Sequence, residues 1–323
     1  MRKFWLLLLI IICVGISLSL YLKQQREQEQ LAFLVPVQVP EAAVTENSAV
    51  VTWHWTTARP EPAGIVDYNL YINDWAAGST KDWNYGTPGM PRLALSKNKV
   101  TDTWEQRNQC TLTGLESYTY YNLYLEPVLA DGRTLPRSML EFNTLPGGEN
   151  LSVMEYGVLG EDSTDDTEML QRIINLCPSG GRVVLRRGRY FAGPLRLHGQ
   201  MTLELKEGAV LTALPPVTKN PAAVLPLPDV PLALFNCAGG AQVRLTGKGK
   251  LVSGGYPLLA CSKTTNLYIK DLSLQAREPQ EKILSLRACQ GVALNGLRME
   301  NAGPGSVDLT DSSELLLVNY RLP

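Results

Sequence analysis

The chain has 323 residues, which is enough for about two domains and a short additional segment. Thirty basic and 31 acidic residues give a formal net charge of −1, which excludes the strong basic field typical of nucleic-acid-binding proteins. The 27 glycines and 21 prolines favour a β-rich chain with many tight turns over a helical bundle.

Residues 1–32 are predicted to be a signal anchor followed by a polar spacer. Two basic residues precede an uncharged run from Phe4 to Leu22. A membrane-spanning helix needs about 20 residues and the apolar part of a secretory signal roughly 7–15, so this run is closer to a membrane span. Ser19-Leu20-Tyr21 has bulky residues where a signal peptidase needs small ones. An uncleaved anchor in a membrane is therefore favoured over a cleaved signal peptide, and both place residues 24–323 outside the cytoplasm.

Residues 33–146 have the pattern of short alternating strands. In residues 49–55, Ala49, Val51 and Trp53 fall on one face of a strand. Further strands are predicted at 66–72 and 121–128. Roughly seven short strands in about 110 residues, with a tryptophan near the second, predict a two-sheet antiparallel β-sandwich.

Part of this region resembles a known module. In TLTGLESYTYYNLYLEPVLADG, Leu115 stands in a Gly-Leu turn and Tyr121 at the start of a strand, as in the fibronectin type III pattern, and Trp53 matches the core tryptophan of that family. The resemblance covers residues 36–145 and implies a module that spaces or orients its neighbours, so no chemistry is assigned to it. Three further tryptophans could stack on a sugar ring, although packing in the core or loops is the simpler interpretation: Trp75, Trp83 and Trp104.

A capping helix is predicted after the glycine pair at 147–148. Thr164 or Asp165 is expected to be its N-cap, because either side-chain oxygen can accept an unpaired N–H of the first turn. Pro178 and the glycines at 180–181 end the helix, and short strands ended by glycine follow at 182–190 and 201–211. The apolar face of the helix comprises Met169, Leu170, Ile173, Ile174 and Cys177.

A repeat dominates the rest of the sequence. Similar strand patterns begin at positions 241, 266, 291 and 314, so their starts step by 25 (266 − 241), 25 (291 − 266) and 23 (314 − 291). A period near 25 with one such strand in each unit predicts a parallel β-helix, in which each coil stacks on the previous one.

The six cysteines contain no Cys-x-x-Cys pair, which argues against a zinc site. We expect no metal and no cofactor. Cys237, Cys261 and Cys289 precede successive repeat strands, so they are expected to stack as small apolar side chains in a ladder. Disulfides in an exported chain are the alternative. The three cysteines outside this expected ladder are Cys13, Cys110 and Cys177.

The segment at 153–213 resembles the N-terminal signature of the polygalacturonase-like β-helix superfamily, and a fibronectin-like module ahead of it is similar to bacterial exo-acting polygalacturonases. The resemblance implies an all-β chain: the sandwich, then the first coils of a right-handed parallel β-helix with an N-terminal capping helix, over residues 147–323. It also implies a pectin-type polysaccharide as substrate. The matching residues, in order, are Tyr156-Gly157, Thr164-Asp165-Asp166-Thr167, Gly180-Gly181, Gly188, Tyr190 and Gly193-Pro194-Leu195.

In that family, aspartates hydrolyse the α-1,4 bond of polygalacturonate, one as the acid and others activating water. The motifs that carry the reaction are Asn-Thr-Asp, Gly-Asp-Asp, Gly-His-Gly and Arg-Ile-Lys, and none of them occurs here. Asn143-Thr144 is followed by Leu145, and Asp165-Asp166 is interpreted as a helix cap. The two histidines are His54 and His198, and His198 is expected to face solvent at a bend.

The remaining charged candidates give no catalytic assignment. Asp308 and Asp311 lie three residues apart on a predicted strand, so their side chains are expected on opposite sides. Arg186-Arg187 and the pair Lys248 and Lys250 are interpreted as solvated surface. We therefore predict no catalytic, cofactor-binding or metal-binding residue in this chain.

Taken together, these patterns predict the front part of a polygalacturonase-type hydrolase that stops about one coil before the catalytic motifs, and is inactive by itself. A membrane-anchored, non-catalytic sugar-binding or structural protein is the alternative, and a disrupted gene is a third interpretation. An uncovered last coil would favour aggregation through the strand at 315–318 unless something covers it.

Overall fold

The computed structural model describes residues 16–23, 34–55, 60–73, 75–79, 92–97, 104–161, 163–215, 227, 229–240 and 242–318. The chain forms two compact units. Unit 1 comprises Met1–Gln38, Trp53–Pro91 and Tyr121–Phe142, and unit 2 comprises Val39–Thr52, Arg92–Tyr120 and Asn143–Pro323. The predicted domain boundary at 146–147 stays a prediction.

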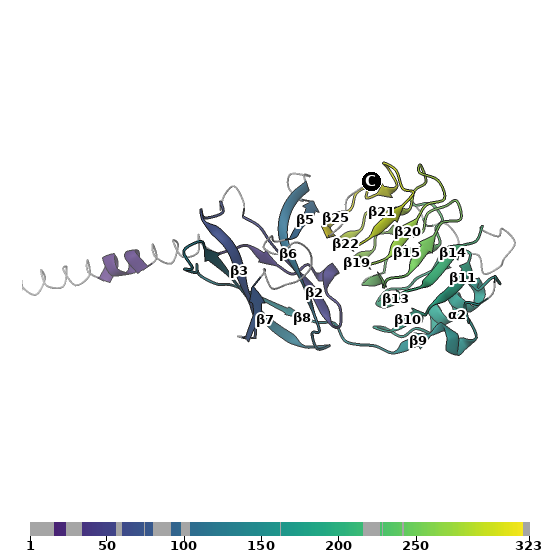
Figure 1. Cartoon of the computed structure of the whole chain (residues 1–323), viewed down its shortest axis with the longest axis horizontal. Coiled ribbons are helices and arrows are strands. Elements are labelled where there is room, and N and C mark those ends of the chain that lie inside the picture. The colour runs from purple at the N-terminus through teal and green to yellow at the C-terminus, as the bar shows by residue number, and fades with distance from the viewer. Residues whose placement is uncertain are drawn as a thin grey trace, which may run out of the picture. The chain divides into compact units, whose positions relative to one another are not determined.

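Unit 1 contains a four-stranded sheet in the order β4-β3-β7-β8, with β3 antiparallel to both neighbours (Figure 1). The predicted core tryptophan, Trp53, is 1% exposed and meets Tyr68 edge-on at 5.2 Å between ring centres. Tyr121 is also buried, as expected, and stacks on Phe142 at 5.5 Å. The strands are β1 (Val37–Gln38), β3 (Ile65–Ile72), β4 (Trp75–Ser79), β7 (Tyr120–Leu129) and β8 (Ser138–Asn143).

Unit 2 begins with the short 3-10 helix η1 (Glu41–Ala43) and three strands, β2 (Ser48–Trp53), β5 (Arg92–Lys97) and β6 (Trp104–Thr113). Strand β5 is antiparallel to β6 on one side. On its other side it pairs antiparallel with the last described strand, β25 (Ser313–Val318), with Leu95 opposite Leu317. This pairing covers the β25 edge of the long sheet, which the sequence did not predict.

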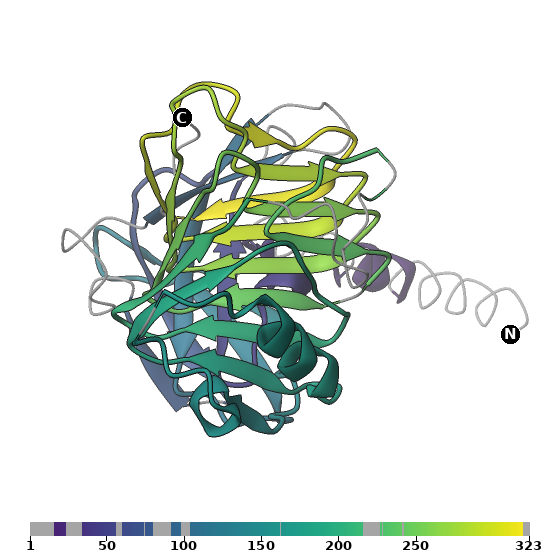
Figure 2. The ribbon, with the colours of Figure 1, turned by 90° about the vertical axis from the view of Figure 1, so that its right-hand side faces the viewer.

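The rest of unit 2 is a parallel β-helix, as predicted. Three sheets run along it: the long sheet β9-β10-β13-β16-β19-β22-β25, a second sheet β11-β14-β17-β20-β23 and a third sheet β12-β15-β18-β21-β24. Figure 2 shows these strands stacked in layers, with α2 (Thr167–Leu176) at the end where the first coils lie. The strands are β9 (Asn150–Ser152), β10 (Arg182–Leu185), β11 (Gly188–Ala192), β12 (Leu195–Arg196), β13 (Met201–Leu205), β14 (Ala209–Ala213), β15 (Phe235–Ala238), β16 (Val243–Thr246), β17 (Lys250–Val252), β18 (Leu259–Ser262), β19 (Thr265–Lys270), β20 (Ser273–Gln275), β21 (Leu284–Arg287), β22 (Gln290–Asn295), β23 (Arg298–Glu300) and β24 (Val307–Asp308).

The predicted repeat gives the register of the long sheet from β19 to β25, where partners step by 25 (293 − 268) and 23 (316 − 293), but from β16 to β19 the step is 24 (268 − 244), one less than predicted. Leu245, Ile269, Leu294 and Leu317 are partners in consecutive parallel strands, and all are buried in the interior of the β-helix. Because side chains alternate along a strand, the residues between them point to the outer face of the sheet. The period found in the sequence therefore corresponds to one coil.

Two predicted strands are each divided by a corner. Residues 182–190 form β10 and β11, and residues 201–211 fall in β13 and β14. The two strands of each pair belong to different sheets, because the chain must turn from the long sheet to the second sheet within every coil. In the first coil this corner is formed by Arg186-Arg187. In the next coil the corner contains Gly208, which has a positive φ.

The predicted capping helix is present, but it begins later than expected. Its N-cap position is Asp166 rather than Thr164 or Asp165, although the Asp165 side chain makes the predicted contact with a first-turn N–H. The Asp165 carboxylate accepts the Thr167 N–H at 2.9 Å, and the Asp166 carboxylate accepts the Phe191 N–H of β11 at 3.0 Å. Asp166 is therefore used to attach the helix to the first coil. Of the predicted apolar face, Leu170, Ile173, Ile174 and Cys177 are buried, and Met169 packs against the core.

Helix α2 satisfies backbone groups at the first coil of the second and third sheets. The Thr167 hydroxyl accepts the Gly193 N–H at 2.7 Å, and the Gln171 side chain accepts the Arg196 N–H at 2.7 Å. The Nε2 atom of His198 lies 3.0 Å from the carbonyl oxygen of Ile174. The prediction that His198 faces solvent is therefore wrong, because the ring is half-buried and is hydrogen-bonded to the last turn of the helix.

The cysteines of the coils stack without bonding covalently. Cys237 and Cys261 are register partners in β15 and β18, and both are free and buried. Cys289 lies just beyond β21, with Sγ 3.6 Å from the Cys261 carbonyl. Burial raises the pKa of the Cys261 thiol well above its ordinary value. The expected ladder is therefore present for Cys237 and Cys261, whereas Leu286 rather than Cys289 is the next register partner, and Cys110 and Cys177 are also free.

Most of the predicted anchor at residues 4–22 lies outside the described residues. Residues 16–23 are described and form a helix. Within the described ranges, no helix has both the length and the apolar character needed to cross a membrane.

Candidate functional site

The outer face of the long sheet carries the most unusual group of polar side chains. One row of register partners runs across its strands: Arg182 in β10, Thr202 in β13, Arg244 in β16 and Tyr268 in β19. The residues that follow them in sequence, such as Leu245, are buried in the interior of the β-helix. Alternation along each strand therefore places this row on the outside.

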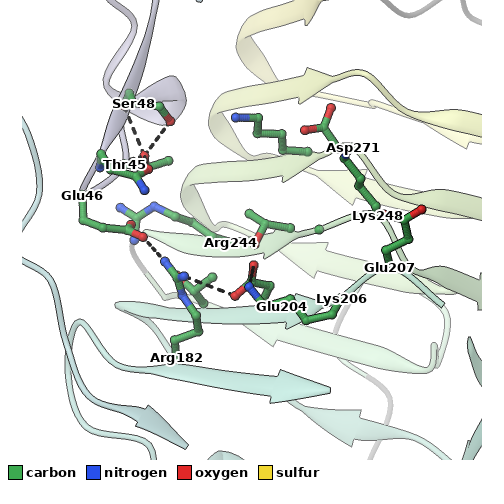
Figure 3. Close-up of a pocket in the computed structure, with 15 residues that line it drawn as sticks. Thr45, Glu46, Ser48, Arg182, Glu204, Lys206, Glu207, Arg244, Lys248 and Asp271 are labelled. Carbon is green, nitrogen blue, oxygen red and sulfur yellow. Dashed lines mark hydrogen bonds and ion pairs between the residues drawn. The ribbon is translucent and has the colours of Figure 1, made fainter. Parts of the chain in front are cut away.

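A turn of the N-terminal segment of unit 2 lies over this row and closes a hollow (Figure 3). Thr45 and Ser48 fix the turn, because the Thr45 N–H donates to the Ser48 carbonyl at 2.8 Å and their hydroxyls are 2.7 Å apart. Leu115 donates its N–H to the Asn47 carbonyl at 3.0 Å, which attaches the turn to unit 2 at a second point. Glu46, within this turn, is thereby held over the sheet.

We name this space the arginine hollow. It has a volume of about 370 Å³, which is within the range of small-ligand pockets. It is lined by Thr45, Glu46, Asn47, Ser48, Arg182, Thr202, Glu204, Lys206, Glu207, Arg244, Thr246, Gly247, Lys248, Lys270 and Asp271.

The two arginines of the hollow have different partners. Arg182 forms ion pairs with Glu46 and with Glu204, the latter at 3.2 Å, and Glu204 also meets Lys206 at 2.6 Å. Arg244 is only 7% exposed, yet no carboxylate of the described residues lies within ion-pairing distance of it. Burial and the nearby Arg182 charge lower the pKa of Arg244 to about 10. The Arg244 guanidinium is therefore a charged donor without a charged acceptor.

Gly247 lets the chain turn the corner beside the hollow. Its φ of +110° suits glycine, and a Cβ at this position would collide with the Leu205 carbonyl of the preceding coil. The close approach of these two coils keeps Thr246 and Lys248 at the rim of the hollow.

The prediction that Asp308 and Asp311 share one strand is wrong, because β24 ends at Asp308 and Asp311 lies in the turn that follows. The Asp308 carboxylate, in β24, forms ion pairs with Lys282 Nζ at 3.2 Å and Arg287 Nη2 at 3.4 Å, and it accepts the Thr310 N–H at 3.1 Å. Burial opposes ionisation of Asp308, but the Thr310 hydrogen bonds and the Lys282 pair outweigh it and lower the pKa to about 2. Asp311 is exposed in the following turn. Near neutral pH Asp308 is therefore an ionised partner of two cations rather than a proton donor.

The other candidates lie apart from the hollow or only at its edge. Arg186 and Arg187 are exposed, as predicted. Lys250 pairs with Glu300 at 2.6 Å, whereas Lys248 is exposed at the rim. Trp83 lies outside the described residues, and sugar stacking by Trp75 and Trp104 stays a prediction. Among the residues that the structure describes, no group of three His, Cys, Asp or Glu side chains could hold a metal.

Sequence reasoning missed Arg182 and Arg244. Arg182 begins the stretch RVVL and Arg244 is the second residue of VRLTG, and both stretches were interpreted only as strands. Their signal was positional, because the same outer row holds a tyrosine, an alanine and a leucine in later coils. A charged residue in a row that is apolar in the later coils indicates a polar partner.

Comparison with known proteins places these features in context. No family model matches the sequence. A curated protein from Dickeya chrysanthemi, an exo-poly-alpha-D-galacturonosidase, is 25% identical over 244 residues, covering 70% of this chain and 40% of that protein. The family 28 exopolygalacturonase of Yersinia enterocolitica has a similar structure, with a TM-score of 0.64 and 19% identity over 85% of this chain and 60% of that one. A putative glycosyl hydrolase from Parabacteroides merdae gives a TM-score of 0.45 at 18% identity, over 55% of this chain and 99% of that one.

The chain thus spans about two fifths of the length of its curated relative and three fifths of the Yersinia enzyme. The sequence match and the shared fold confirm the predicted resemblance to polygalacturonase-like glycoside hydrolases.

Proposed function

Because the chain is polygalacturonase-like in sequence and fold, we propose that it corresponds to the front part of a pectin-directed glycoside hydrolase. Its ligand is polygalacturonate or a fragment of it. The observation that carries the proposal is the parallel β-helix with its capping helix, in a chain that is similar to an enzyme named for galacturonoside hydrolysis. The arginine hollow supports it, because its spare cation suits an acidic sugar polymer.

We further propose that the chain binds this polymer without cleaving it. Hydrolysis requires an acid that protonates the leaving oxygen and a carboxylate that activates water, placed on either side of one bond. Asp308 is less exposed than Asp311, and its low pKa leaves it no proton to donate near neutral pH. The four catalytic motifs are absent from the 323 residues.

The proposal has a two-part test. The full chain is incubated with polygalacturonate and with cellulose, and both co-sedimentation and the release of reducing ends are measured. Retention on calcium-crosslinked polygalacturonate but not on cellulose, with no reducing ends above buffer, is expected. Turnover would contradict the lack of cleavage, and equal retention on both polymers would contradict the substrate class.

A second candidate is a non-catalytic sugar-binding protein exported and held at a membrane by residues 4–22. Two observations favour it: the uncharged run in the sequence, and the pairing of β25 with β5, which covers one edge of the β-helix. Fractionation of cells that express the full chain or a variant without residues 1–32 tests this role. Recovery of only the full chain with membranes is expected, whereas equal recovery of both in the soluble fraction would contradict it.

A further inference from the structure

The arginine hollow contains a buried positive charge without a matching negative one. Two of the four carboxylates that line the hollow, Glu46 and Glu204, are engaged by Arg182 and Lys206, and none of the four forms an ion pair with Arg244 among the described residues. The register partner of Arg244 in the next coil is Tyr268. Burial raises the pKa of that phenol far above neutrality, so it contributes no negative charge. Arg244 is therefore uncompensated by the described side chains around it.

An uncompensated buried cation is costly to the folded state. Removing a guanidinium from water is unfavourable unless a carboxylate and hydrogen bonds replace the lost hydration. A Leu or Met at position 244 would continue the apolar row of Tyr268, Ala293 and Leu316. The presence of Arg instead indicates an anionic ligand that supplies the missing partner when it binds.

The other groups of the hollow define what kind of anion fits. Five basic and four acidic side chains line it, which leaves one positive charge in excess and suits a single carboxylate. The carboxylates disfavour a doubly charged group such as phosphate. The hydroxyls of Thr45, Ser48, Thr202 and Thr246 surround the arginines, and hydroxyls and carboxylates are good partners for the hydroxyls of a sugar.

We infer that the arginine hollow is a binding site for one uronic acid unit, with the Arg244 guanidinium bonded to the sugar carboxylate. Arg182 lies two strands away in the same row and keeps Glu46 and Glu204 in place as acceptors for sugar hydroxyls. The site is on the outer face of the long sheet, whereas Asp308 lies in the third sheet. The inference rests on the proposed function for the identity of the sugar, but it requires no bond cleavage.

Calorimetric titration of the full chain provides the test. The ligands are the galacturonic acid trimer, the neutral galactose trimer and inorganic phosphate. We expect the acidic trimer to bind at least tenfold more tightly than either of the others. This preference should weaken as salt increases, because the Arg244 contact is electrostatic.

The decisive variant is Arg244→Met, compared with Arg172→Gln, which removes an exposed arginine from helix α2. We expect R244M to bind the acidic trimer at least tenfold more weakly. Its Tm should rise by about 2–4 °C, because an uncompensated cation is replaced by an apolar chain of similar length. R172Q should change neither property. The combination of lost binding and higher Tm would not arise from general damage.

If R244M does not fold, Arg244→Lys provides a second variant. This variant keeps the positive charge but loses the planar pair of donors. Its affinity for the acidic trimer is expected to be lower than that of the parent and higher than that of a chain that does not bind. Unchanged affinity in folded R244M or R244K would overturn the inference while leaving the proposed function intact. Equal binding of phosphate would also overturn it. Failure of the parent chain to bind the acidic trimer would overturn both.

Discussion

The two halves of one row on the long sheet have opposite environments. In the first coils the outer row comprises Arg182, Thr202 and Arg244 and faces the arginine hollow. In the later coils the same row continues as Tyr268, Ala293 and Leu316, which pack against Ala42, Ala43 and Val50. The fold requires only that this face be compatible with a strand, so its chemistry is free to differ from coil to coil.

This difference separates stability from recognition on a single surface. The apolar half fixes η1 and β2 against the β-helix within unit 2. The turn at 45–48 connects these two elements and closes the hollow, so the apolar half also positions the turn. Recognition by the polar half therefore depends on packing by the apolar half.

The largest expected effect is in the apolar half. Leu316→Ala removes a side chain that is 3% exposed and should lower the free energy of unfolding by about 2–5 kcal/mol. Lys270→Ala, at the polar half, is the control and should change it by less than about 0.5 kcal/mol. Urea unfolding measures both. Equal losses would show that the two halves do not differ in their contribution to stability.

The second effect compares the two arginines. Arg182→Met leaves the mostly buried Glu46 without its cation and leaves Glu204 with only Lys206, and should cost about 1–3 kcal/mol. Arg244→Met is expected to be stabilising, because an uncompensated cation is removed and no carboxylate loses a partner. Thermal unfolding of the two variants distinguishes these signs. A loss of stability in both would mean that Arg244 has a partner in the folded chain.

The third effect is pH-dependent and lies on another sheet. The pKa of Asp308 is about 2 in the folded chain, below the usual value of about 3.9, so this carboxylate stabilises the fold above about pH 4. That contribution, at most roughly 2.6 kcal/mol, is lost as the pH falls from about 4 to 2. Asp308→Asn should therefore have a lower Tm than the parent at pH 6 and the same Tm near pH 2. A difference independent of pH would contradict the ion pairs.

The smallest effect is expected at the boundary between the halves. Tyr268→Phe removes the hydroxyl that accepts the Asn295 side-chain N–H at 3.2 Å, at a cost of about 1 kcal/mol. Tyr256→Phe, which loses a hydrogen bond to the Leu214 carbonyl, is the matched control outside the long sheet. We expect similar losses of Tm in both, but altered trimer binding only in Y268F, because Tyr268 adjoins Arg244. Unaltered binding in Y268F would place the ligand away from the boundary.

The sequence predicted the features that depend on local periodicity. The repeated strand pattern predicted the coils, since each coil repeats the same alternation of buried side chains. The apolar face of α2 and the ladder of Cys237 and Cys261 followed from the same kind of pattern. These predictions were correct because neighbouring residues, or residues one period apart, decide them.

The features that the sequence did not predict depend on contacts between distant segments. Arg244 is buried because the turn at 45–48, from a much earlier part of the chain, forms the roof of the hollow. His198 is bonded to the last turn of a helix that ends at Leu176, and β5 pairs with β25 although the whole β-helix separates them in sequence. No single-sequence pattern records which segments meet. The candidate site was therefore missed although its residues were all visible.

The most direct test of the account is a proton NMR spectrum of the galacturonic acid trimer in the presence of the full chain. The account predicts broadened trimer resonances, as expected for a bound ligand, and no new reducing-end anomeric signals over many hours. Sharp, unshifted trimer resonances would contradict binding, and new anomeric signals would contradict the absence of cleavage.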